Sequence, residues 1–381
     1  DKVRLGVIGA GNMGLGHVRY ILNGEIKGLE LAAVCERSPA NLERAKRILP
    51  DHVSVYHDAC EMFASGAVDG VLIATPHFLH PELAIAAFRH GLHVLTEKPA
   101  GVSTAEVRRM NEAAKASGKV FGIMFHHRFY GAYRKLKELI ADGELGEIRR
   151  TNWIITEWYR KQSYFESAPW RGTWAGEGGG SLVTQASHQL DVWVWTTGMM
   201  PARVWARCYF GKRRRIETDD EVMACVEYAN GATGVFITSL TEAPGTNRYE
   251  VVGDRGKAVV EDGRLTLWRL RVPESQFNSE NRPGLPEAWR IDVPVEESPH
   301  HTLLVSHAHK RLTQNWTDAI LHGADLVAKG EEGILSLTLS NAMYLSTWTG
   351  QWVDLPFDEE LFAALLQERI RGTPTVNPDR S

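Results

Sequence analysis

The feature that most constrains the fold is a glycine-rich turn near the N-terminus, which joins an apolar strand to an apolar helix. Val3–Ile8 has the composition of a buried strand, and the sequence GAGNMG follows it directly. In this setting the first glycine permits a tight turn, the second lets the backbone approach a pyrophosphate, and the third lets the helix pack on the strand. Free N–H groups at the start of the helix favour phosphate binding. The pattern predicts a dinucleotide site that includes Gly9, Gly11, Asn12, Met13 and Gly14.

An acidic residue follows the next predicted strand. Glu36 directly follows the predicted strand Leu29–Cys35 and comes about 20 residues after the glycines. A carboxylate at this position of the fold accepts hydrogen bonds from the ribose diol of a dinucleotide. Its charge would repel a 2′-phosphate, so Glu36 favours NAD over NADP. Arg37 and Ser38 leave NADP open, because they could receive that phosphate. Ser38 also has the pattern of a helix N-cap, since Pro39 follows it.

The stretch from Val71 to Pro99 reads as strand, helix and strand, and it ends in the sequence EKP. Glu97 and Lys98 therefore follow the carboxyl end of a strand, the edge where open α/β sheets bind ligands. Strands and helices continue to alternate as far as Phe125, which predicts a parallel, doubly wound sheet. We assign residues 1–125 to this Rossmann domain.

The pattern changes after residue 125. Gly178–Gly180 precede an apolar stretch, Ser181–Thr196, which is expected to be one helix. Several strands joined by hairpin sequences such as Asn230-Gly231 and Asp262-Gly263 come next. Residues 126–381 are therefore expected to form an α+β domain around a large, mostly antiparallel sheet. The fold class predicted for the whole chain is α/β.

Composition excludes several classes of partner. The formal net charge is -4, which argues against nucleic acid and anionic membranes. No apolar run approaches the roughly 18 residues of a transmembrane helix. The four cysteines are far apart and form no CxxC pair, so we expect reduced thiols in a cytoplasmic protein. No group of residues has the spacing of a metal site, and none is predicted.

Four segments together resemble the Gfo/Idh/MocA oxidoreductases, a family that includes glucose-fructose oxidoreductase and inositol dehydrogenase. They are the glycine turn, Ala74-Thr75-Pro76, Glu97-Lys98-Pro99, and GGG with a later His188 and Asp191. The resemblance covers nearly the whole chain in the right order. It implies a nicotinamide cofactor, a small carbohydrate or cyclitol substrate, and a second domain that binds substrate and makes oligomer contacts. A homodimer or homotetramer is expected, because an open sheet exposes apolar area.

The resemblance also implies two catalytic residues. Lys98 matches the family's catalytic lysine, whose ammonium would stabilise a developing alkoxide, and the Lys98-Pro99 bond is expected to be cis. His188 is the acid/base candidate because its ordinary pKa lies near neutrality. The family has an acidic residue at the Thr184 position, one helical turn before His188, but a threonine is no general base at neutral pH.

The remaining candidates line the two halves of the expected site. For the cofactor they are Arg37, Thr75, Pro76, His77, Glu97 and Lys98, in addition to the glycine turn and Glu36. For the substrate they are His126, Tyr159, Arg171, Trp174, Thr184, His188 and Asp191. Aromatic rings pack on sugar C–H surfaces, and arginines donate to hydroxyls or to an anion.

Three functions remain open from the sequence. The first is an NAD-dependent dehydrogenase of a sugar, glycoside or cyclitol hydroxyl. The second is a glycosidase that oxidises a sugar transiently, eliminates the aglycone and returns the hydride, an alternative that Thr184 raises. The third is a non-catalytic protein that senses NAD, against which EKP and His188 both argue.

Overall fold

The computed structural model describes residues 2–296 and 301–372 of the chain, which form two compact units. The first unit consists of residues 2–129 and 301–337, and the second of residues 130–296 and 338–372. The predicted second domain, 126–381, is therefore not one continuous segment in this division. A segment near the C-terminus returns to the first unit, which nothing in the local sequence indicates.

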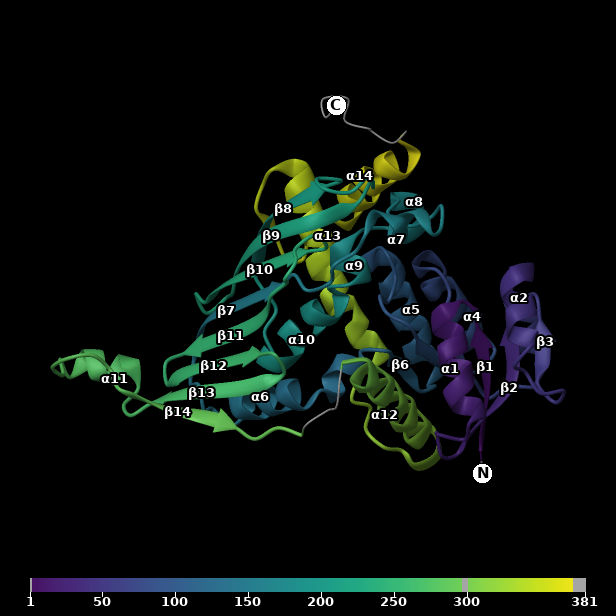
Figure 1. The fold of residues 1–381 in the computed structure, drawn as a ribbon, viewed down its shortest axis with the longest axis horizontal. Helices are drawn as coiled ribbons and strands as arrows, with labels where there is room; N and C mark the ends of the chain where they lie inside the picture. Colours follow the sequence, from purple (N-terminus) through teal and green to yellow (C-terminus); the bar gives the residue numbers. More distant parts are fainter. Residues whose placement is uncertain (1, 297–300, 373–381) are drawn as a thin grey trace. The chain divides into compact units, whose positions relative to one another are not determined.

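The first unit contains the predicted parallel sheet, with six strands in the order β3-β2-β1-β4-β5-β6 (Figure 1). The strands are β1 (Val3–Ile8), β2 (Leu29–Cys35), β3 (Ser54–Tyr56), β4 (Gly70–Ile73), β5 (His93–Thr96) and β6 (Phe121–Ile123). The helices between them are α1 (Asn12–Leu22), α2 (Pro39–Lys46), α3 (Ala59–Ala64), α4 (His80–Arg89) and α5 (Thr104–Ser117), with short 3-10 turns η1 (His77–Leu79) and η2 (His126–Phe129). The doubly wound fold is thus confirmed.

Helix α12 (His301–His322) packs on this sheet through a buried tryptophan. The Trp316 indole donates to the carbonyl of Val94 on β5 at 3.0 Å. A Cβ at Gly70 or Gly122 would lie 2.9 or 3.0 Å from the same ring. Two strands therefore carry glycine where the indole approaches their backbones, and this explains how a distant helix joins the first unit.

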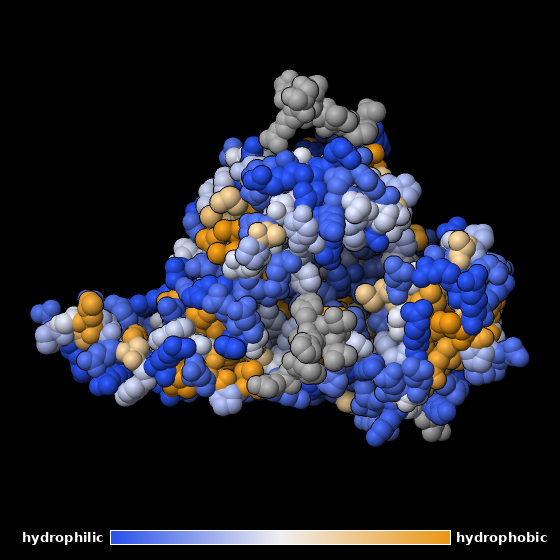
Figure 2. Space-filling view, viewed as in Figure 1, coloured by the Kyte–Doolittle hydropathy of each residue, from blue (hydrophilic) through white to orange (hydrophobic). Residues whose placement is uncertain are grey.

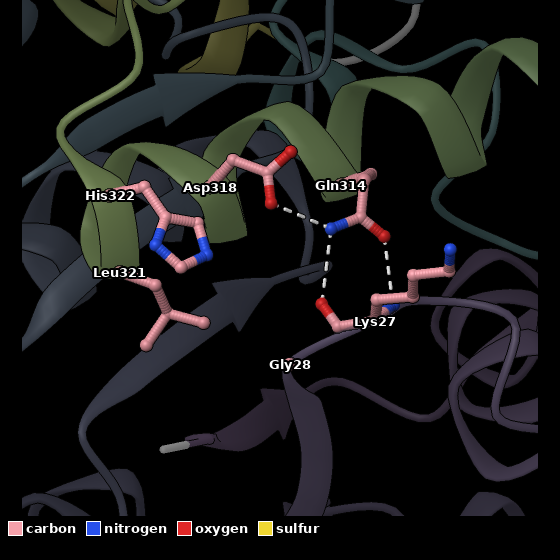
Figure 3. A pocket seen from close by; sticks show the side chains of 6 residues that line it. All are labelled: Lys27, Gly28, Gln314, Asp318, Leu321 and His322. Atoms are coloured by element: carbon pink, nitrogen blue, oxygen red, sulfur yellow. Dashed lines mark hydrogen bonds between the residues drawn. The ribbon is translucent and has the colours of Figure 1, made fainter.

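A second contact fixes α12 at the rim of a surface pocket (Figure 3). The Gln314 amide accepts from the Lys27 backbone N–H at 2.8 Å and donates to the Lys27 carbonyl at 3.0 Å. Asp318 accepts from the same side chain at 2.9 Å. The pocket is lined by Lys27, Gly28, Gln314, Asp318, Leu321 and His322. None of the predicted site residues is among them. The pocket is therefore a gap between α12 and the segment before β2 and not part of the predicted site.

The second unit is built on a nine-stranded mixed sheet with the order β14-β13-β12-β11-β7-β10-β9-β8-β15 (Figure 1). Among the strands that the structure describes in this sheet, only β7 and β10 pair in parallel, so the predicted mostly antiparallel sheet is confirmed. The strands are β7 (Ile148–Ile155), β8 (Arg203–Phe210), β9 (Asp219–Glu227), β10 (Thr233–Ser239), β11 (Asn247–Gly253), β12 (Gly256–Glu261), β13 (Arg264–Leu270), β14 (Ala288–Val293) and β15 (Val353–Asp354).

Helices cover one face of this sheet. Trp153 on β7 and Tyr249 on β11 stack at 4.2 Å and are fully buried beneath them. The Trp193 indole donates to the Thr151 hydroxyl at 2.9 Å. The helices of this unit are α6 (Gly131–Ala141), α7 (Gln162–Glu166), α8 (Trp174–Glu177), α9 (Ser181–Thr184), α10 (Ser187–Thr197), α11 (Glu274–Ser279) and α14 (Glu359–Arg371). Helix α13 (Gly333–Thr349), after the turn η3 (Gly330–Glu332), contains the boundary between the units.

The opposite face of the sheet carries exposed apolar residues. Trp205, Met223 and Val235 are 37%, 45% and 36% exposed, and the strand register places Cys225 between Trp205 and Val235. Figure 2 shows orange, hydrophobic residues on this sheet among blue, hydrophilic ones. Among the described residues, no helix is both long and apolar enough to cross a membrane.

Candidate active site

The segments singled out in the first unit meet at one edge of its sheet. The last residues of β1, β4 and β5, which are Ile8, Ile73 and Thr96, are register partners. The glycine turn, Thr75-Pro76 and Glu97-Lys98 therefore leave the sheet side by side. The strand order reverses between β1 and β4, and this switch point is where doubly wound sheets bind their ligands.

The three glycines of the turn meet different surroundings. Gly9 has φ +94°, and a Cβ there would lie 2.5 Å from the Ala74 carbonyl oxygen. A Cβ at Gly14 would lie 1.8 Å from the Gly9 carbonyl oxygen. A Cβ at Gly11 would meet no atom within 4 Å. Packing therefore requires glycine at 9 and 14 but not at 11, and an open space beside Gly11 fits the approach of a diphosphate.

This difference gives a testable prediction. Gly11→Ala should fold normally but bind NAD about tenfold more weakly, because the added methyl group occupies the space a diphosphate would fill and about 1.4 kcal/mol is lost. Gly16→Ala is the matched control, since a Cβ there also meets nothing within 4 Å but lies farther along α1. Calorimetric titration with NAD measures both. Equal affinities for the two variants would contradict a diphosphate at Gly11.

Glu36 is held by the backbone at the end of β2. Its carboxylate accepts from the N–H of Ala10 at 2.7 Å and from the N–H of Ser38 at 2.8 Å. The Ser38 hydroxyl accepts from the N–H of Asn41 and caps α2, as its sequence pattern predicted. Arg37 is exposed. The carboxylate is thus fixed beside the glycine turn, where the ribose of a dinucleotide would be bound.

The EKP segment is anchored from behind by a buried pair. The Lys98-Pro99 bond is cis, as the family resemblance implied, and the Lys98 side chain is half-buried. The carboxylate of buried Glu97 contacts His17 Nε2 at 2.7 Å and accepts from the backbone N–H of Lys98 at 3.3 Å. One oxygen therefore contacts helix α1, and the other holds the backbone of the catalytic candidate.

This anchor extends into a network that sequence reasoning missed. His17 Nδ1 lies against the hydroxyl of Tyr20, which is 2.9 Å from the hydroxyl of Thr313 on α12. Burial disfavours ionisation of Glu97, but the hydrogen bond and charge of His17, with the charges of His309 and Lys98, outweigh it and lower the pKa of Glu97. A charged Glu97 therefore holds the EKP segment in place. The sequence contained one indication for His17, which is a histidine within the mostly apolar helix α1.

A second histidine ties the two loops together. His80 is fully buried, and its ring nitrogens lie 2.9 Å from the Thr75 carbonyl and 2.7 Å from the Pro99 carbonyl. Burial is the main cause that lowers the pKa of His80. The Thr75-Pro76 and Lys98-Pro99 segments are therefore fixed relative to each other. His77 lies in η1, with its ring centroid 6.0 Å from that of His80.

His126 belongs to a group of histidine rings that lie against one another in the first unit. Its ring centroid lies 4.0 Å from that of His309 and 4.8 Å from that of His127. Burial and the nearby charges of His309, His127 and Lys98 lower the pKa of His126 well below its ordinary value. We therefore expect a neutral imidazole at this position.

In the second unit, one carboxylate organises the GGG segment. Asp219 is fully buried at the start of β9 and accepts from the N–H of Gly180 at 2.8 Å, the N–H of Leu182 at 3.1 Å and the hydroxyl of Ser181 at 2.5 Å. The Tyr344 hydroxyl donates to it at 2.5 Å. The start of α9 is thus fixed to the sheet by a side chain about 40 positions away along the sequence.

The single helix expected over Ser181–Thr196 is wrong. The chain forms α9 and α10, separated at Gln185 and Ala186, where the N–H of Ala186 bonds the carbonyl of Ser181 and breaks the regular pattern. Thr184 and His188 therefore do not lie one turn apart on a continuous helix. The Thr184 hydroxyl is 2.8 Å from the carbonyl of Gly180. His188 and Asp191 are both buried on α10, three positions apart.

The aromatic loop divides into exposed and buried residues. Tyr159 is 45% exposed, and the Arg171 guanidinium stacks on Tyr164. Trp174 is only 4% exposed and packs edge-on against Phe210, Tyr344 and Trp348. This packing favours a structural role for Trp174 over the predicted substrate contact.

Comparison with known proteins identifies the family of this chain. Residues 3–125 match the model of an oxidoreductase family with an NAD-binding Rossmann fold, and residues 133–259 match the GFO/IDH/MocA C-terminal domain. An inositol 2-dehydrogenase of Pseudarthrobacter chlorophenolicus is 36% identical over 343 residues, which cover 85% of this chain and 87% of that protein. The chain therefore belongs to the GFO/IDH/MocA family and is an oxidoreductase with an NAD-binding Rossmann domain.

Two further relatives extend the comparison. A scyllo-inositol 2-dehydrogenase (NADP(+)) of Bacillus subtilis, IolW, is 25% identical over 88% of this chain and 90% of its own. The structure of the WlbA dehydrogenase of Bordetella pertussis in complex with NADH and UDP-GlcNAcA has a TM-score of 0.77, is 25% identical, and aligns over 94% of this chain and all of its own.

Proposed function

We propose that this chain is an NAD(H)-dependent dehydrogenase that acts on a hydroxyl of a sugar, glycoside or cyclitol, with Lys98 and His188 handling the proton. The observation that carries this proposal is the placement of Lys98. It follows β5 at the same edge of the first sheet where β1 and β4 end, and a buried Glu97–His17 pair fixes its backbone. The relatives named inositol 2-dehydrogenase support the substrate class.

A bound nicotinamide supplies the hydride acceptor at this edge. The chain's own residues would do the rest. The Lys98 ammonium stabilises negative charge on the oxygen that loses its proton, and the imidazole of His188 takes or returns a proton near neutral pH. Glu97, fixed by His17, holds the lysine in place. Asp191, three positions from His188 on α10, and His126 are proposed to contact or support the substrate.

A glycosidase that uses NAD catalytically remains the second candidate. Thr184 favours it, because its hydroxyl bonds the Gly180 carbonyl and supplies no carboxylate at the position where the family has an acid. A panel of free sugars, cyclitols and aryl glycosides, incubated with NAD, separates the two reactions. NADH that accumulates with substrate loss supports the dehydrogenase. Aglycone release without net NADH would replace it with the glycosidase.

Cofactor choice follows from Glu36, which we propose selects NAD over NADP. Glu36→Gln should raise the affinity for NADP relative to NAD about fivefold, because removing one charge near the 2′-phosphate relieves about 1 kcal/mol of repulsion. Glu30→Gln, an exposed carboxylate on the same strand, is the matched control. Titrations with both cofactors measure the ratio, and an unchanged ratio in Glu36→Gln would refute this role.

The two units are proposed to divide the work. The first binds NAD, and the second binds substrate and a second copy of the chain. The exposed row of Trp205, Cys225 and Val235 is the apolar area that a homodimer or homotetramer would bury. The four free cysteines support a reducing, cytoplasmic location.

This assembly is testable with one substitution. Val235→Glu should lower the mass measured by light scattering from that of the oligomer to that of a smaller species, because it places a charge in the face that the oligomer would bury. Lys115→Glu, on the exposed side of α5, should leave the mass unchanged. A wild-type monomer at micromolar concentration would count against the proposal.

A further inference from the structure

The second unit gathers three guanidinium groups around aromatic rings. The Arg160 and Arg171 guanidinium carbons lie 5.1 and 4.4 Å from the centroid of the same ring, Tyr164. Arg171 also stacks on Trp170 at 4.6 Å and donates to the Tyr164 hydroxyl at 2.6 Å. The third member, Arg214, belongs to a different segment. We refer to Arg160, Arg171 and Arg214 as the arginine cluster.

Arg214 is brought to the other two by the backbone. Its Nε donates to the Arg160 carbonyl at 2.7 Å, and its guanidinium lies 5.4 Å from the Tyr159 ring. The turn that carries it is fixed by Asp220, whose carboxylate accepts from the three successive N–H groups of residues 212–214. The cluster is therefore organised before any ligand arrives.

The cluster has no internal counter-charge. Within residues 2–296 and 301–372, no carboxylate lies within ion-pair distance of any of its three guanidinium groups, although Lys212 and Arg215 next to it pair with Glu221 at 2.8 Å and Glu166 at 2.9 Å. In the same described part of the chain, the Nε atoms of Arg160 and Arg171 are buried without an acceptor. Three positive charges close together repel one another, and some of their N–H donors lack an acceptor. A bound anion would offset the repulsion and accept hydrogen bonds from these donors.

The cluster lies at the same end of the sheet as the GGG segment. Arg160 follows β7, and its N–H bonds the carbonyl of Leu240, just after β10. Arg171 precedes Gly172, whose carbonyl accepts from the N–H of Glu217 at 2.8 Å, two positions before the Asp219 that holds α9. Figure 1 shows α7 and α8, which flank Arg171 in the sequence, at this end of the second unit.

We propose that the arginine cluster is an anion subsite that makes the substrate an acidic carbohydrate, one carrying a carboxylate or a phosphate. This inference rests on the proposed function and names the substrate class. A guanidinium presents a planar set of N–H donors that matches both oxyanions bidentately, and stacking on an aromatic face leaves its N–H edge available. The exposed Tyr159 ring offers an apolar surface for the sugar itself.

The test compares charged probes with neutral partners of the same shape. D-glucuronate is paired with D-glucuronamide, and D-glucose 1-phosphate with D-glucose, and the affinity of the NAD-loaded full chain for each is measured by calorimetry. NADH formation is recorded in parallel. We expect at least one acid to bind about 10- to 100-fold more tightly than its neutral partner, and the preferred pair distinguishes a carboxylate from a phosphate.

Arg171→Ala should abolish that preference, so that the acid binds no more tightly than its neutral partner. Arg215→Ala is the control, because Arg215 already pairs with Glu166 and its side chain is 82% exposed. Equal binding of acid and neutral partner in both pairs would overturn the subsite. Equal binding with NADH formed from a neutral sugar would overturn it and leave the proposed function standing. A preference for the acid without NADH from any probe would support the subsite and count against the proposed function.

Discussion

Replacing Lys98 with alanine is expected to lower kcat about 1000-fold, within the range for losing a proton-transfer or charge-stabilising group. The half-buried ammonium follows β5 at the edge where β1 and β4 also end. Its removal leaves the developing alkoxide without a cation. The loss in kcat is measured from initial rates of NADH formation, with the substrate that the carbohydrate panel identifies.

Two controls separate chemistry from folding in this experiment. NAD affinity should fall far less than kcat in Lys98→Ala, because the glycine turn and Glu36 remain. Lys115→Ala removes an exposed lysine from α5 in the same unit and should keep wild-type rates. If Lys98→Ala retained full turnover, the assignment of Lys98 would be incorrect.

Replacing Asp219 with alanine is expected to cost about 3–5 kcal/mol of stability, because several buried donors lose their acceptor at once and each costs about 1–3 kcal/mol. The carboxylate accepts from Gly180, Ser181, Leu182 and Tyr344. The start of α9 would separate from β9. Activity should fall as well, because α10 and His188 follow this segment directly.

Urea unfolding followed by tryptophan fluorescence measures this loss. The matched control is Asp292→Ala, which removes an exposed carboxylate paired with Arg290 at 3.3 Å. Surface pairs of this kind contribute about 0–1 kcal/mol, so its unfolding midpoint should stay near that of the wild type. An Asp219→Ala midpoint equal to that of the wild type would show that the four hydrogen bonds do not fix the segment.

Local sequence patterns were enough to predict the first half of the candidate site. Strand, glycine turn and helix follow one another directly, and Glu36 comes about 20 residues after the turn. Glu97-Lys98 directly follow an apolar run that marks the preceding strand. Each of these elements is determined by residues close together in the sequence, so local spacing is enough to predict it. The two sheets were predicted in the same way: alternating strands and helices indicate a parallel sheet, and a series of hairpins indicates an antiparallel one.

Contacts between distant residues could not be predicted in this way. His17 meets Glu97 across 80 positions, and Tyr20 meets Thr313 across 293. The break between α9 and α10 was missed because Ser181–Thr196 contains no glycine or proline to mark it, and the anchoring Asp219 comes much later in the chain. The packing of Trp174 against Tyr344 and Trp348 of α13 could not be predicted either, because these residues lie far from the aromatic-rich loop in the sequence.

In the proposed reaction a carbon-bound hydrogen of a carbohydrate passes to NAD at the edge of the first sheet that carries Lys98. The most direct measurement uses sugars and cyclitols deuterated on carbon, with mass spectrometry of the nicotinamide product. We predict one deuterium on the reduced nicotinamide with the wild type, and about 1000-fold slower formation of the same deuterated product with Lys98→Ala. Consumption of the carbohydrate without deuterium entering the nicotinamide would contradict the account.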